Sequence, residues 1–273
     1  MSESKTLESV AALLHVVSEW ECENMEPELA AYGIWYRGQP DRTQDLVPGV
    51  ERSWFTRKAA KRWPHLSSQE QQFRAEMCLN EQFRRLGASF FRDEDDLVRI
   101  YFLAQHYALP TRLLDWTTNP LAALFFACQE SKSGSGLSDP HHERLFVVKY
   151  NQFGKTNLKD PVGDHGDEVI ATVKFVFGET DGTPGKPGII SVLPPLGFPR
   201  MMRQGSCFTL HMPGAEKLVF DGESTPAGCG IFSYEIPAGV KRHILAELRC
   251  LGVGWFSLFT DLEYLAKELK ESL

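Results

Sequence analysis

The side chains best suited to chemistry are concentrated in residues 105–128, which read QHYALPTRLLDWTTNPLAALFFAC. The segment holds three side chains that can donate or accept hydrogen bonds and carry charge, His106, Arg112 and Asp115, and threonine hydroxyl groups follow them. Polar groups at this density are poor core builders, and exposed loops on a rigid scaffold more often serve binding or chemistry. The segment is therefore the first candidate for a functional site.

The neighbouring pattern predicts the elements that hold these side chains. A helix is expected over 95–106, followed by a short strand at 113–117. Asn119 and Pro120 suit the N-cap and the first position of a helix over 120–129. That helix is apolar on nearly all sides, so we expect it to be buried.

Helical periodicity predicts further helices at 6–20, 68–87, 239–251 and 260–272. The apolar stripe of the first contains Leu7, Val10, Leu14 and Val17, and that of the second contains Phe73, Met77, Leu79, Phe83 and Leu86. In the last helix, Thr260–Glu263 reads as a capping box.

Segments rich in β-branched and aromatic residues predict the strands. They are expected at 32–38, 144–150, 169–176, 189–192, 207–211, 218–220 and 232–236. Helices come first, strands dominate later and helices close the chain. This order predicts an α+β fold: a single domain with an antiparallel or mixed central sheet flanked by helices.

The charge balance limits the partners of the chain. Its 273 residues include 29 basic and 36 acidic ones, which gives a formal charge of −7. Such a protein has no general attraction for phosphate backbones, so nucleic-acid binding would require a local basic patch. One patch is present at 57–63 (RKAAKRW), and its simpler interpretation is a solvated helix face.

The cysteines do not form a recognisable metal site. None of the six belongs to a CxxC pair, and no Cys/His cluster has zinc-site spacing, so no metal is expected. The N-terminus lacks the apolar core of a signal peptide, and no apolar run is long enough to cross a bilayer. We therefore expect a cytoplasmic protein with reduced thiols and no membrane association.

Four segments, in order, resemble motifs of the FRG domain family. They are YRGQ at 36–39, the block at 105–117 with its downstream NP and AALFFA, RMMRQGSCFT at 200–209, and the closing pair at 248–253 and 258–262. The resemblance runs from residue 30 to the C-terminus. It implies an FRG-type domain at 30–273, preceded by an N-terminal helix and an acidic lead-in at 1–29.

Two positions depart from this family pattern. Thr260 stands where the family usually has proline, a change that is harmless at a helix cap. Ala108 stands where the family usually has glycine, so a backbone angle that only glycine adopts easily is in question there. The resemblance implies an intracellular effector of bacterial toxin or phage-defence systems, but it does not specify a reaction.

A second, looser resemblance is to ADP-ribosyltransferases of the arginine type. Tyr36-Arg37-Gly38 is similar to their first strand, and Thr117-Thr118, before an Ala-x-x-Phe-Ala helix, is similar to their second element. This resemblance implies an ADP-ribosyltransferase-like fold and an NAD-type nucleotide as cofactor. Arg37 would clamp the pyrophosphate by charge-assisted hydrogen bonds, and Gly38 would let the nucleotide approach the backbone.

The remaining contacts follow from the same resemblance. The hydroxyl groups of Thr117 and Thr118 would orient the nicotinamide-side ribose, while His106 and Arg112 would add donors. The family's catalytic glutamate has no counterpart here, because Gln204 lies near its expected position. Gln204 can bind a ribose hydroxyl but supplies no charge, so Asp115 is the candidate for that role.

Each candidate also has a structural alternative. Arg37 could form a buried ion pair with Asp115, and Arg112 could pair with a carboxylate such as Glu76. His106 could cap the C-terminus of its helix as a cation. Trp116 and Tyr107 could be core residues, and Asn119 could serve only as a helix cap.

These alternatives lead to a second functional hypothesis. The chain could be a recognition module without catalysis, binding nucleic acid or a protein partner through the same cleft and the basic helix. The sequence does not identify the macromolecular acceptor.

Overall fold

The computed structural model describes residues 6–22, 34–40, 44–92, 96–130, 143–149, 166–180, 188–194, 199–215, 218 and 231–271. The α-helices are α1 (Val10–Cys22), α2 (Ser53–Arg62), α3 (Ser68–Leu86), α4 (Leu97–His106), α5 (Pro120–Ala127), α6 (Gly166–Val176), α7 (Pro199–Arg203), α8 (Lys241–Cys250), α9 (Trp255–Phe259) and α10 (Leu262–Glu271). Short 3₁₀ turns are η1 (Gly49–Glu51), η2 (Ala88–Phe90) and η4 (Ala238–Val240). The strands are β1 (Ile34–Gln39), β2 (Leu113–Thr117), β3 (Glu143–Lys149), β4 (Ile189–Val192), β5 (Ser206–His211) and β6 (Ile231–Ile236).

The strands form one sheet in the order β4-β5-β2-β1-β3-β6, and all neighbouring strands are antiparallel. The sheet divides into two halves, because β1 and β2 pair only where Tyr36 lies opposite Thr117. On either side of that junction, β1 pairs with β3 and β2 pairs with β5 along their whole lengths. The predicted α+β fold is therefore confirmed, with an antiparallel sheet.

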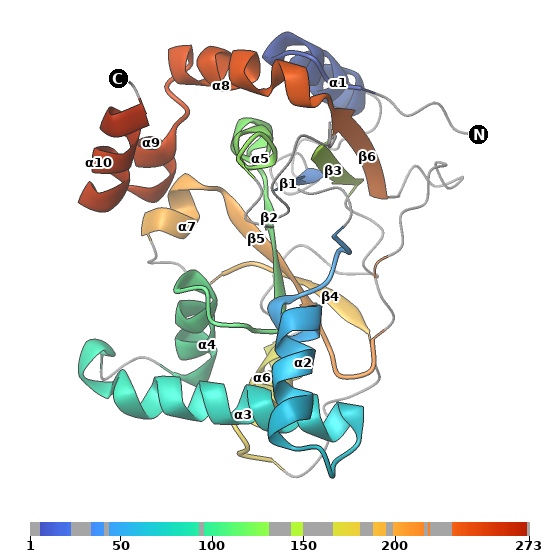
Figure 1. Ribbon diagram of the computed structural model, residues 1–273, viewed down its shortest axis with the longest axis vertical. Coiled ribbons are helices and arrows are strands. Elements are labelled where there is room, and N and C mark those ends of the chain that lie inside the picture. Colours follow the sequence, from blue (N-terminus) through green and yellow to red (C-terminus); the bar gives the residue numbers. More distant parts are fainter. Residues whose placement is uncertain are drawn as a thin grey trace.

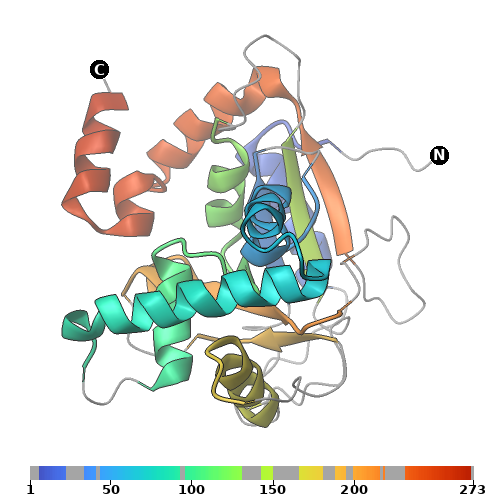
Figure 2. The same ribbon diagram turned by 60° about the horizontal axis from the view of Figure 1, so that its bottom comes forward.

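The helices gather at two ends of the molecule (Figure 1). At one end, α1 and α8 lie over α5, with α9 and α10 beside them (Figure 1). At the other end are α2, α3, α4 and α6, and Figure 2 shows α3 crossing the front between α2 and α6. Among the described residues, no helix has the length and apolar character needed to span a bilayer.

The helix α5 is the centre of the first core. Asn119 caps it by accepting hydrogen bonds from the main-chain N–H groups of Leu121 and Ala122, as its sequence predicts. Five of its side chains are buried, Ala122, Ala123, Leu124, Phe125 and Ala127. They share a core with residues of α1, β1, β6, α8 and α9.

Two further cores cover the rest of the sheet. One joins α4 and α6 to the side of β2 and β5 that carries Leu113, Phe208 and Leu210. The other lies on the opposite side and contains Trp35, Leu114, Trp116 and Cys207. Because side chains alternate along a strand, these two cores fix which side chains of β2 face each way.

The predicted strand at 169–176 is wrong, since this segment is the helix α6. Its β-branched residues favoured a strand, but Val169, Val173 and Val176 are buried at helical spacing and pack in one core. Of the strand predicted at 218–220, residues 219 and 220 lie outside the described residues, and Leu218 belongs to no strand.

The predicted stripes of two helices also need correction. Leu7 lies in an extended segment before α1 and is not part of the helix. Within α1 the buried positions are Val10 and Leu13, and Leu14 is 47% exposed. In α3, Leu86 is exposed, and the fully buried residues are the polar Glu76 and Asn80. Their partners on other elements explain this burial.

The capping box predicted at Thr260–Glu263 lies in a different local structure. Thr260 adopts φ 62° and ends α9, a helix that the periodicity did not predict. The helix α10 begins after it, with the carbonyl of Asp261 accepting from the main-chain N–H of Leu265. Thr260 is therefore a left-handed C-cap, a conformation closed to proline.

Candidate functional site

Arg37 lies where the two halves of the sheet separate. Its Nη1 donates a hydrogen bond of 2.6 Å to the main-chain carbonyl oxygen of Asp115, beyond the single pairing of β1 with β2. Burial lowers the pKa of the Arg37 guanidinium to about 10. The negative charge of Asp115 opposes this shift, and the positive charge of Arg52 adds to it. Nε of Arg37 is buried and has no hydrogen-bond partner among the described residues. The predicted ion pair with Asp115 is thus replaced by a contact with the main chain.

Gly38 has a packing role. A Cβ atom added at this position would lie 1.8 Å from the carbonyl oxygen of Ala123 and 2.5 Å from the nitrogen of Ala127. The absence of a side chain therefore lets α5 pack directly on β1. The expected approach of a nucleotide is blocked on this side of Gly38, because the backbone of α5 fills the space.

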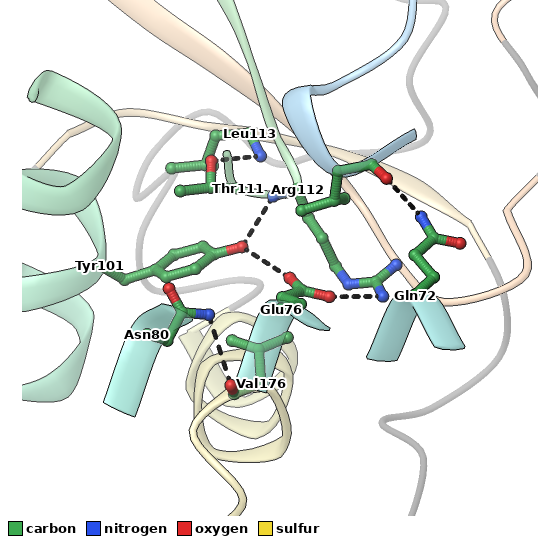
Figure 3. Close-up of polar contacts among 9 residues, drawn as sticks. Gln72, Glu76, Asn80, Tyr101, Thr111, Arg112, Leu113 and Val176 are labelled. Carbon is green, nitrogen blue, oxygen red and sulfur yellow. Dashed lines mark hydrogen bonds and ion pairs between the residues drawn. The ribbon is translucent and has the colours of Figure 1, made fainter. Parts of the chain in front are cut away.

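Arg112 is engaged in a buried ion pair (Figure 3). Its Nη2 lies 2.7 Å from Oε2 of Glu76 on α3, and the Oε1 of Glu76 accepts a hydrogen bond from the hydroxyl of Tyr101. That hydroxyl accepts, in turn, from the main-chain N–H of Arg112, at 2.7 Å. Burial acts to lower the pKa of Arg112, but Glu76, Tyr101 and Glu51 together outweigh it, so the arginine pKa is raised. The structural alternative is confirmed, and the predicted cofactor contact is not available to this buried guanidinium.

A second buried chain lies on the same side of β2 as Trp116. The indole N–H of Trp116 donates to the hydroxyl of Thr209 at 3.0 Å, and this hydroxyl lies 3.1 Å from Nε2 of His211. Burial lowers the pKa of His211 to about 4, and Arg112 and Arg37 contribute in the same direction. His211 is therefore a neutral core residue at physiological pH.

The predicted ribose-binding threonines meet the segment that contains Gln204. The hydroxyl of Thr117 donates to the main-chain carbonyl of Gln204 and accepts from the main-chain N–H of Asn119. The N–H of Thr118 donates to the carbonyl of Gly205 at 2.8 Å. Gly205 has φ +57°, and a Cβ atom there would lie 2.7 Å from the Thr118 hydroxyl. These contacts hold the end of β2 against the beginning of β5.

The exposed part of the site is built around Asp115. Its carboxylate accepts a hydrogen bond of 2.7 Å from the side-chain amide of Gln105, whose oxygen accepts in turn from the hydroxyl of Thr111. The helix α4 thereby orients a carboxylate that is open to solvent. Nε2 of Gln204 is buried and lacks a hydrogen-bond partner in the described part of the chain.

Arg200 on α7 is a site residue to which the motif alone assigned no role. Its guanidinium stacks 4.1 Å from the ring centre of Phe259, and Nη1 donates to the main-chain carbonyl of His106 at 3.4 Å. Burial lowers its pKa, whereas Tyr264, Asp115 and Asp261 oppose that shift.

His106 ends α4 and is half buried beside this arginine. Burial, followed by the charge of Arg200, lowers the pKa of His106, while Asp261 acts in the opposite direction. The cationic helix cap considered from the sequence is therefore disfavoured, because a neighbouring cation already bonds the last carbonyl. A neutral imidazole can accept a proton or a hydrogen bond.

The structure thus brings some candidates together and separates others. His106, Asp115, Thr117, Thr118 and Gln204 lie on segments that contact one another, together with Arg200. Tyr36 is buried in the core below α5, and Arg112 faces Glu76. Arg37 contacts the group through the backbone of Asp115. The expected convergence of all predicted residues in one cleft is therefore not observed.

A shallow hollow on the described surface lies away from these residues. It has a volume of about 410 Å³. It is lined by Val10 of α1, by His243, Ala246, Glu247 and Cys250 of α8, and by Leu251, which follows α8. None of the candidate residues contributes to it. In the described part of the chain, no group of three or more His, Cys, Asp or Glu side chains is placed to hold a metal ion.

Comparison with known families assigns part of the chain. Residues 33–135 match the FRG domain. This segment includes β1, the 105–117 block and α5, and therefore confirms the resemblance of the first two motifs. Neither the curated proteins nor the solved structures yielded a match.

Proposed function

Because the chain contains an FRG domain, we propose that it is a cytoplasmic effector domain that binds an NAD-type nucleotide in the manner of an ADP-ribosyltransferase. One observation carries the proposal. The elements related by resemblance to such enzymes lie on three adjacent strands, with Tyr36 opposite Thr117 and Thr117 opposite Ser206. Segments far apart in the sequence therefore occupy neighbouring strands in the order β1, β2, β5.

The side chains near Tyr36, Thr117 and Ser206, the three residues that lie opposite one another on β1, β2 and β5, suit the parts of a dinucleotide. Arg37 is partly exposed where β1 and β2 separate, and Arg200 provides a second partly exposed cation, so both are candidates for the pyrophosphate. The free amide of Gln204 and the exposed carboxylate of Asp115 are suited to ribose hydroxyl groups. Binding requires only local charge, so it is compatible with the net negative charge of the chain.

Transfer chemistry would make a further demand. Cleavage of the bond to nicotinamide develops positive charge on the ribose, which a nearby carboxylate stabilises. Gln204 cannot supply this charge, whereas the carboxylate of Asp115 can, and Gln105 holds it in place. A macromolecular acceptor would then take the ADP-ribose. A role in bacterial toxin or phage-defence systems belongs to the same proposal.

The proposal is tested by calorimetric titration with NAD, together with chromatography for released nicotinamide. Arg37→Lys keeps the charge but loses the planar fork, so it should weaken NAD binding about tenfold or more. The matched control is Arg249→Lys, an exposed position on α8, which should leave binding unchanged. The absence of NAD binding by the unmodified protein would overturn the proposal.

A non-catalytic recognition module is the second candidate. Arg37, Arg112 and Thr117 each already bond another part of the protein, so these motif residues also have a purely structural use. Under this alternative, the protein would neither bind NAD nor release nicotinamide.

A further inference from the structure

The helix α2 carries a face that the nucleotide proposal does not use. Its buried residues are Phe55 and Ala59, which turn one side of the helix toward α3 and η1. On the other side, the exposed positions include Trp54, Arg57, Lys58, Lys61 and Arg62. These five residues follow helical spacing and form one stripe, which we call the α2 face. In Figures 1 and 2, α2 lies at the front of the molecule.

The α2 face is a local positive region on an acidic protein. The sequence contains no acidic residue between Arg52 and His65, although the whole chain has a formal charge of −7. Among the described residues, none of the four cations of the face has a carboxylate within ion-pair distance. Glu70, at the start of the next helix, is engaged in the capping box with Ser67. The positive charge is thus not neutralised locally.

Aromatic rings accompany these cations. Trp54 is 45% exposed, and Nζ of Lys58 lies 5.5 Å from the centre of its ring. At the other end of the helix, the guanidinium of Arg62 lies 5.0 Å from the ring centre of Trp63. Favourable interaction with the helix dipole accounts for Lys61 and Arg62 in the last turn. It does not account for the unpaired cations nearer the start or for an exposed tryptophan.

We propose that the α2 face binds single-stranded nucleic acid without strong sequence preference. Cations that follow a backbone, combined with an aromatic ring on which a base can stack, are the features that such binding requires. From Trp54 to Arg62 the face spans about 12 Å of helix, which is enough to contact more than one phosphate group. The exposed tryptophan favours a single strand over a duplex, whose bases are already stacked. This site is independent of the nucleotide site proposed above.

The test is fluorescence anisotropy with a labelled oligothymidylate at several salt concentrations. Replacing four cations by glutamine (Arg57→Gln, Lys58→Gln, Lys61→Gln and Arg62→Gln) should weaken binding by about 100-fold or more at low salt, where the remaining affinity is still measurable. The slope of log affinity against log salt should fall in magnitude by about 3, since each phosphate contact to a single strand contributes about 0.7. A matched control changes two arginines and two lysines on other exposed helix surfaces: Arg242→Gln, Arg249→Gln, Lys267→Gln and Lys270→Gln.

A second pair of variants tests the tryptophan. Trp54→Ala should weaken oligothymidylate binding by at least about fivefold, whereas Trp54→Phe should retain most of the affinity. The proposal is overturned if the control set weakens binding as much as the α2 set does. It is also overturned if duplex DNA, phosphatidylglycerol vesicles or polyglutamate bind more tightly than the single strand, or if Trp54→Ala has no effect.

Discussion

Nη2 of Arg112 lies 2.7 Å from Oε2 of Glu76, and the two side chains are 6% and 0% exposed. The pair joins α3 to the segment that enters β2, and Tyr101 of α4 bonds both partners, through the carboxylate of Glu76 and the main chain of Arg112. Three elements therefore meet at one charged contact inside the protein. A charge pair of this kind is costly to break, because the remaining partner stays buried.

Glu76→Gln tests this contact. The substitution keeps the size of the side chain but leaves Arg112 as an uncompensated buried charge, so the free energy of unfolding should fall by about 3–5 kcal/mol. The control is Glu81→Gln on the same helix, where the pair with Arg84 is partly exposed and should contribute at most about 1 kcal/mol. Urea unfolding at neutral pH measures both. Equal effects of the two substitutions would contradict this account.

Ala108 adopts φ 60°, the left-handed conformation that was in question because the position lacks the family's glycine. An alanine strains the backbone there, whereas glycine does not. Ala108→Gly should therefore raise the free energy of unfolding by about 0.5–1 kcal/mol, after the entropy that glycine gains in the unfolded chain is taken into account. Ala60→Gly within α2 should instead lower it by about 1 kcal/mol. Denaturant unfolding of both variants checks the opposite signs.

His211 should make stability depend on pH. Its pKa is lowered to about 4 in the folded protein, so the unfolded chain binds the proton more readily. The contribution of neutral His211 to the free energy of unfolding is fully present above the unfolded pKa of about 6.5. This contribution is lost as pH falls toward 4. The loss amounts to about 3 kcal/mol.

The variant His211→Gln should have a shallower dependence of unfolding free energy on pH over this range, measured by urea titration at successive pH values. His243→Gln on the exposed surface of α8 serves as the control. A slope that does not change in His211→Gln would show that other groups determine the acid sensitivity.

Local sequence signals predicted the elements that depend mainly on local chemistry. The cap at Asn119 and the buried helix after it were predictable because both signals lie within a few residues. The segment 169–176 was not, because its β-branched residues fit a strand equally well and only packing against α4 decides for a helix. The sequence offered Glu76 as a possible partner of Arg112, but the full burial of Glu76 was not predictable, because it depends on residues far along the chain.

The site shows the same division. The sequence identified Asp115 and Gln204 as candidates, and the contacts between their segments agree with that grouping. It could not show that α5 packs on Gly38, because the glycine is explained by a helix remote in sequence. Arg200 belongs to the FRG-like segment 200–209, but its stacking on Phe259 and its hydrogen bond to His106 arise only in the folded chain.

Asp115→Asn tests whether the proposed nucleotide site also performs transfer. Asparagine keeps the size of the side chain and can still accept the hydrogen bond from Gln105, but it removes the negative charge. If Asp115 stabilises charge on the ribose or acts as general base, nicotinamide release should fall by about 100-fold or more. The dissociation constant for NAD should change by less than about threefold. Chromatography and calorimetry measure the two quantities separately.

Gln105→Ala provides the matched comparison, because it removes the residue that orients Asp115 and leaves the charge in place. A catalytic carboxylate predicts a smaller loss of turnover in Gln105→Ala than in Asp115→Asn, with NAD binding retained in both. Parallel loss of binding and turnover in Asp115→Asn would assign Asp115 the role of holding β2 and the Arg37 contact in place. Full turnover in Asp115→Asn would remove Asp115 from the chemistry, because no charge would then be needed at this position.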